Sequence, residues 1–185
     1  ELSHWRGHRS VLRWSQAALY QFAAPTARAN SYRTNRLLLA AGLIDAPVPG
    51  VGQWDEILKN PLLWHFRFGG PDMERLVAGR ERIYLDRFWN EFSATPARFG
   101  EAARRHYAAL YAQPGAMHAG FAQFAAFDQD AADNRAWLAQ GGRLKMPVLA
   151  VGGEKSFGPM MATVMRFAAD DVTEGIVPGS GHWIM

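Results

Sequence analysis

The chain has 185 residues, of which 49% are hydrophobic, 20% charged and 12% aromatic, so it can form one folded domain with a substantial core. Because it contains no cysteine, the sequence excludes disulfide scaffolds, zinc ribbons, iron–sulfur sites and thiol nucleophiles, and we expect a cytoplasmic protein. The net charge is only +3 and no apolar run reaches eighteen residues, so we expect neither a nucleic-acid nor a membrane partner.

The first 36 residues differ in composition from the rest of the chain. They contain six Arg, no Lys and a single acidic residue, which superficially resembles a transit peptide. His4 and His8 have helical spacing, but no third ligand stands nearby, so we predict no metal site there. We leave residues 1–36 unassigned, and we interpret them first as a truncated or misread piece of coding sequence.

From residue 37 onward, the pattern predicts buried strands separated by helices. Apolar runs bounded by Gly and Pro predict strands at 37–45 and 146–153, and a third strand within 172–183 that ends in a Gly-rich loop. A helix at 159–169 separates the second strand from the third. This order predicts an α/β fold, with a partial sheet formed by residues 37–52 and 141–185.

The segment 53–140 contains no strand signal and predicts about five helices. One apolar stripe runs from Met73 to Phe92 at helical spacing, and two more predict helices at 103–111 and 117–124. Asp72 and Thr95 lie in the breaks GGPD (69–72) and SATPARFG (93–100) and are predicted to cap helices.

Polar side chains follow two of the predicted strands, at the ends where open α/β sheets bind ligands. His182 lies in the loop GSGHW after the last strand and is placed to act as a general base. A loop histidine that only hydrogen-bonds a carbonyl fits this context equally well. Asp45 follows the first strand and could orient an imidazole, although it could also cap the turn that follows.

Other titratable residues have weaker support from the sequence. His65 lies among aromatic residues in LLWHFRF, where a buried core histidine is the commoner outcome. Glu154 and Lys155 follow the second strand and fit a solvated turn. His106 and His118 have no supporting context.

Residues 43–185 resemble the C-terminal half of an α/β-hydrolase of the epoxide hydrolase and haloalkane dehalogenase group. The matching pieces are LIDAPVPG, LLWHFRF, LVAGRERIYLDRFW, MPVLAVGGE and GSGHW. The resemblance implies that residues 53–140 form a cap domain over an active site at the carboxyl edge of the sheet. It also implies hydrolysis of a small apolar substrate (an epoxide, a haloalkane or haloacid, or an ester) through a covalent ester intermediate. Neither an organic cofactor nor a metal is implied.

The resemblance assigns roles to individual residues. His182 would activate water, and Asp45 would be the triad acid, because Ser156 stands where many relatives have that acid. His65 and Trp64 would face the substrate from the cap, with His65 polarising the leaving group. The expected apolar walls are Phe66, Phe68, Phe121 and Phe124.

Two features depart from the family pattern. Phe124 stands where related epoxide hydrolases and some dehalogenases have a tyrosine that donates to the epoxide oxygen or contacts the halide, and its lack of a hydroxyl argues against plain epoxide hydrolysis. The family nucleophile is expected in a sharp elbow roughly 20–25 residues before Asp45, by typical element and loop lengths. That window centres on Gln21 and contains no such elbow.

We therefore expect the chain by itself to be inactive, as a partial copy of a hydrolase that lacks its nucleophile. The alternative is a non-catalytic remnant that binds a hydrophobic ligand or a protein partner. A complete elbow encoded in the DNA just upstream would distinguish the two. The sequence does not predict an oligomeric state.

Overall fold

Three parallel strands form the sheet of the computed structural model, which describes residues 41–184. The strands are β1 (Ala41–Ile44), β2 (Val148–Gly153) and β3 (Val172–Val177), in the order β1-β2-β3. The predictions made for residues 1–40 lie outside the described residues.

The carboxyl ends of the three strands lie at the same edge of the sheet. Ile44 at the end of β1 pairs with Val151, and Gly153 at the end of β2 pairs with Val177. The last strand ends at Val177 and the chain then turns at Gly179, where φ is +68°, so a Gly-rich loop follows the strand as predicted. Asp45 and the loops after β2 and β3 therefore leave the sheet side by side.

The helix α9 (Met160–Met165) connects β2 to β3 and packs against both strands. It is shorter than the predicted helix at 159–169. Its apolar residues are buried on several sides because the helix lies between the sheet and neighbouring loops. Together with residues of β1 and β2 they form one core, which includes Leu43, Val148, Ala150, Met161, Val164 and Met165.

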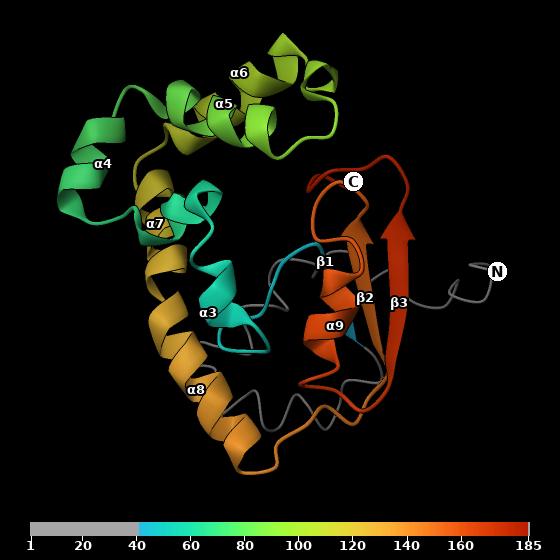
Figure 1. The fold of residues 1–185 in the computed structure, drawn as a ribbon. Coiled ribbons are helices and arrows are strands. Elements are labelled where there is room, and N and C mark those ends of the chain that lie inside the picture. The colour runs from blue at the N-terminus through green and yellow to red at the C-terminus, as the bar shows by residue number, and fades with distance from the viewer. Residues whose placement is uncertain (1–40, 185) are drawn as a thin grey trace.

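Between β1 and β2, residues 53–140 form a helical insert that contains no strand, as predicted. It has six α-helices and two 3-10 segments, more elements than the five expected. Figure 1 shows α5 and α6 on the side of the sheet toward which β2 and β3 point. In chain order the elements are α3 (Trp54–Ile57), η4 (Pro61–Arg67), α4 (Pro71–Val77), α5 (Glu81–Glu91), η5 (Pro96–Arg98), α6 (Glu101–Tyr111), α7 (Ala116–Ala125) and α8 (Phe127–Ala139).

Three local predictions for the insert were wrong in whole or in part. The stripe from Met73 to Phe92 is not one helix, because Gly79 adopts φ +74° and separates α4 from α5. Asp72 is not the N-cap of α4, because Gly70 occupies that position and Asp72 lies in the first turn of the helix. Thr95 does occupy the N-cap position of η5, but its side chain makes no capping hydrogen bond. The side chain of Asn60, in contrast, caps η4 by accepting a hydrogen bond from Leu62 N at 2.9 Å.

The helices α5 and α6 are joined by a buried arginine. The guanidinium of Arg104 donates to Asp86 Oδ1 at 2.6 Å and to Asn90 Oδ1 at 2.9 Å, both on α5. Its Nε also donates to the carbonyl of Phe99 at 2.8 Å. Because only 11% of the side chain is exposed, these bonds are poorly screened by solvent.

The helix α8 is fastened to the loop that follows β1. A Cβ on Gly50 would overlap the backbone of Ala131, so the loop and the helix pack in direct backbone contact. The amide of Asn134 donates to the carbonyl of Pro49 at 2.9 Å. These contacts hold the insert against the sheet on the side of β1.

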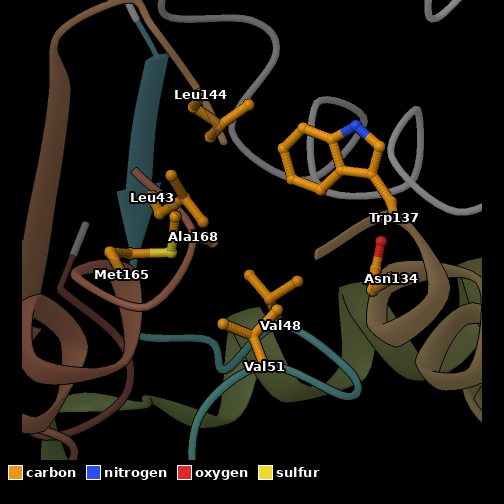
Figure 2. Close-up of a pocket in the computed structure, with 8 residues that line it drawn as sticks. All are labelled: Leu43, Val48, Val51, Asn134, Trp137, Leu144, Met165 and Ala168. Carbon is orange, nitrogen blue, oxygen red and sulfur yellow. The ribbon is translucent and has the colours of Figure 1, made fainter. Parts of the chain in front are cut away.

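A small apolar pocket lies among β1, α8 and α9 (Figure 2). The pocket is lined by Leu43, Val48, Val51, Asn134, Trp137, Leu144, Met165 and Ala168. None of these is a predicted site residue, and only Asn134 among them has an amide side chain. Among residues 41–184, no helix is long and apolar enough to cross a membrane.

Candidate active site

Asp45 lies at the carboxyl end of β1 and is completely buried. Its backbone adopts φ +48°, a left-handed conformation that aspartate tolerates better than most residues. Its Oδ1 accepts hydrogen bonds from the backbone N–H of Gly153 at 2.8 Å and of Phe157 at 3.3 Å. The loop after β2 therefore holds this carboxylate in place with two main-chain donors.

His182 contacts the other oxygen of the same carboxylate. Its Nδ1 lies 2.9 Å from Asp45 Oδ2, so the predicted approach of the two side chains is confirmed. About a third of the His182 side chain, 32%, remains exposed. Among the described residues, its Nε2 has no hydrogen-bond partner, so that nitrogen is free to accept a proton.

The loop that carries His182 packs backbone to backbone against its neighbours. A Cβ on Gly153 would overlap the carbonyl of Gly181, and a Cβ on Gly181 would meet the backbone just after α5. The N–H of His182 donates to the carbonyl of Phe92 at 2.9 Å. Because Gly153 and Gly181 have no side chains, the backbone of this loop packs closely against its neighbours, and this packing fixes the position of the His182 main chain.

The turn after β2 is also tied to this loop. Glu154, which the sequence predicted as a solvated residue, accepts a hydrogen bond from Gly179 N at 2.7 Å. The N–H of Lys155 donates to the carbonyl of Ser180 at 2.8 Å. Ser156 is exposed and makes no side-chain contact with His182 among the described residues.

His65 is buried in an aromatic cluster of the helical insert, with 5% of its surface exposed. Its ring contacts four phenylalanines at centroid distances between 4.6 and 5.6 Å, namely Phe66, Phe88, Phe92 and Phe124. Phe92 also contacts His182, at 6.1 Å, so one aromatic ring lies between the two histidines. Burial, and then the charge of Arg87, lower the pKa of His65 to about 4. His65 is therefore neutral at pH 7.

The other predicted wall residues divide into two groups. Phe66 and Phe124 stack on each other at 5.5 Å and contact His65 directly. Phe121 and Phe68 contact each other at 5.7 Å, and Phe121 is buried without contacting either histidine. Phe121 therefore lies in the core of the insert.

Trp64 lies at the surface of the insert, 42% exposed. Its closest charged neighbour is Arg87, whose guanidinium carbon lies 4.4 Å from the centre of the indole ring. It contacts His65 at 6.4 Å, and no ring contact joins it to Phe92 or His182 among the described residues.

Three contributors to this site were not predicted. Phe88, Phe92 and Arg87 were expected only as residues of a helix, because their proximity to His65 and His182 depends on where α5 lies. The signal in the sequence was the pair Phe88 and Phe92, four residues apart on one helix face beside a basic residue.

Within residues 41–184, no group of three or more His, Cys, Asp or Glu residues could hold a metal ion. What the site offers instead is an imidazole with a carboxylate on Nδ1 and an open Nε2. This pair lies beside His65 and several phenylalanines, and it can move a proton at the edge of an apolar surface.

Neither the protein-family models nor the curated proteins contain a match to this sequence. Solved structures do match. Cfl2 from Burkholderia cenocepacia is similar over 80% of this chain and 52% of its own length, with 35% identity and a TM-score of 0.71. The Cif epoxide hydrolase from Acinetobacter nosocomialis is similar over 86% and 53%, with 22% identity and a TM-score of 0.73.

The epoxide hydrolase CorEH is similar over 84% of this chain and 56% of its own length, with 22% identity and a TM-score of 0.69. The chain thus spans about half the length of the solved structures that it matches. These neighbours share the fold of the matched part of this chain, and they agree with the resemblance found in the sequence. By its fold, the chain is similar to about half of an α/β-hydrolase.

Proposed function

We propose that this chain supplies the base, the acid and the cap domain of a hydrolase that forms a covalent ester intermediate. The observation that carries the proposal is the hydrogen bond between His182 Nδ1 and Asp45 Oδ2 at the carboxyl edge of the sheet. An imidazole oriented in this way is the base of an acyl-transfer triad. The helical insert, residues 53–140, is the proposed cap.

In the proposed reaction, His182 acts on water in the second step. Its Nε2 takes a proton from a water molecule as the oxygen attacks the carbonyl carbon of the ester intermediate. For an alkyl ester on a carboxylate nucleophile, the bond from the carbonyl carbon to the alkoxy oxygen then breaks, and the imidazolium gives its proton to the departing alkoxide, which leaves as the alcohol. The nucleophile is regenerated as a carboxyl group, which releases the remaining proton of the water to solvent. During this step the carboxylate of Asp45 stabilises the positive charge on the ring.

The proposed substrate is small and mostly apolar. The rings of Phe66, Phe88, Phe92 and Phe124 surround His65 and offer hydrophobic walls with few polar groups. His65 is neutral, so it can donate one hydrogen bond to a leaving group without carrying a charge. Phe124 has no hydroxyl to protonate an epoxide oxygen, which argues against plain epoxide hydrolysis.

The proposal requires a nucleophile near Nε2 of His182. We place it in the half of the α/β-hydrolase fold that lies outside the region matched by this chain. A chimera tests this directly: the N-terminal half of CorEH, an epoxide hydrolase, is joined to residues 41–185, and aryl esters, styrene-type epoxides and haloacids are assayed.

Turnover by the chimera is expected, and His182→Ala should trap a covalent ester that mass spectrometry detects on the protein. His106→Ala is the matched control, because His106 is exposed on α6 and should leave turnover unchanged. A folded chimera that forms the ester and releases product equally well without His182 would refute the assignment. Binding of an apolar ligand with no ester formed would support the non-catalytic alternative.

A further inference from the structure

Arg87 is a charged side chain inside the aromatic cluster that surrounds His65. Arg87 lies on α5, and only 12% of its side chain is exposed. Its guanidinium stacks over Trp64 at 4.4 Å and lies 5.3 Å from the rings of Phe88 and Phe92. Its Nε pairs with Glu91 Oε2 at 3.1 Å, one helical turn later. These contacts hold the guanidinium in one orientation.

The same guanidinium makes two contacts with η4 next to His65. Nη1 lies 3.4 Å from Nδ1 of His65, and Nη2 donates to the carbonyl of Leu62. An arginine has only donors, so Nδ1 of His65 must accept, and it can do so only when it carries no proton. In a neutral imidazole, the proton then resides on Nε2.

The Leu62 carbonyl explains why Arg87 is needed for this choice. It lies close enough to His65 to raise the pKa of that ring, although burial and Arg87 lower it more. A protonated Nδ1 could donate to this carbonyl, which would leave Nε2 as an acceptor. Arg87 faces Nδ1 with a donor of its own, so a proton on Nδ1 would point at the guanidinium, and this opposes that arrangement.

We propose that Arg87 is a positioning residue that holds His65 in the neutral tautomer with its proton on Nε2. In this tautomer the ring presents an N–H donor, which can stabilise a leaving group that gains negative charge; the opposite tautomer would repel it. Among the described residues Nε2 has no hydrogen-bond partner, so the donor is available. The use of this donor rests on the proposed function, but the tautomer itself does not.

The test is the tautomer of His65, read from long-range ¹H–¹⁵N spectra of the ¹⁵N-labelled 185-residue chain at pH 7. A His65→Phe variant identifies the His65 signals among those of the six histidines. The unmodified chain should show an unprotonated Nδ1 and a protonated Nε2. Arg87→Met should move the proton to Nδ1, while Arg87→Lys, which keeps a charged donor, should restore the original pattern at least in part.

Arg105→Met is the matched control, because Arg105 is an exposed residue on α6 with a single long contact to Glu101. It should leave the His65 signals unchanged. A protonated Nδ1 in the unmodified chain, or an unchanged tautomer in a folded Arg87→Met chain, would overturn the proposal. Because no substrate is added, the proposed hydrolysis can fail while the tautomer assignment stands, so the two results are distinguishable.

Discussion

Replacing Asp45 by alanine should cost more stability than any other single truncation at the sheet edge. The carboxylate accepts from two backbone N–H groups and from His182, and the residue is completely buried. Leaving a buried donor unpaired costs about 1–3 kcal/mol, and the left-handed backbone at φ +48° adds about 1 kcal/mol for alanine. Because the contact with Phe157 is long, we expect a total of about 4–5 kcal/mol.

Asp45→Asn separates these contributions. Its side-chain oxygen can still accept from Gly153 and Phe157, and asparagine tolerates a left-handed backbone, so the cost should be about 1–2 kcal/mol. The assay is urea unfolding of both variants at pH 7, supported by thermal unfolding. The difference of about 2–4 kcal/mol between the two variants corresponds to about 4–16 °C in Tm for a chain of this length.

The control for these variants is Asp72→Ala, which removes an exposed ion pair with Arg75 and should change stability by at most about 0.5 kcal/mol. If Asp45→Ala and Asp45→Asn lie within about 1 kcal/mol of each other, the reasoning is wrong. Such a result would mean that the backbone donors after β2 find other partners when the carboxylate is removed.

Three further predictions concern packing and charge. Gly181→Ala should lose about 2–3 kcal/mol in urea unfolding, because its Cβ would meet the backbone after α5, whereas Gly42→Ala, with open space, should lose far less. Arg104→Ala should lose about 2–3 kcal/mol and Arg105→Ala at most about 0.5; equal losses would contradict the buried network that joins α5 and α6. Burial, and then the nearby Asp133, raise the pKa of Asp130 to about 6, so the folded chain holds this proton more tightly than the unfolded chain and loses stability as pH rises from about 4 to 6. Asp130→Asn should therefore stabilise the chain by about 1 kcal/mol at pH 7.5 and have no effect at pH 4, and a loss of stability at pH 7.5 would refute this account.

The pairing of Asp45 with His182 could be predicted because it follows from the topology. Each residue follows the carboxyl end of a strand, and parallel strands bring those ends to one edge, so 137 residues of sequence separation do not matter. The prediction did not extend to the donors on Asp45, because they are backbone groups of a turn whose shape the side chains do not reveal.

The structure of the insert was harder to predict in detail. The apolar stripe continues across Gly79 without a change of period, so hydrophobic spacing alone could not show that α4 ends there. The contact of Phe92 with both histidines also depends on how α5 sits above the sheet edge, which no local pattern encodes. Phe121 was predicted to line the substrate pocket because its apolar character in a helical stripe indicates burial. The sequence does not show which residues surround it, and in the structure it contacts neither histidine.

The hydrogen bond from His182 N–H to the carbonyl of Phe92 limits how the insert can be exchanged between proteins. This carbonyl belongs to the end of α5, yet it fixes the main chain of a residue that follows β3. A hybrid that receives residues 53–140 from another chain would keep its sheet but would place the histidine loop against a foreign helix end. Recombination of such inserts should therefore succeed only when the last turn of α5 is retained together with the loop that carries His182.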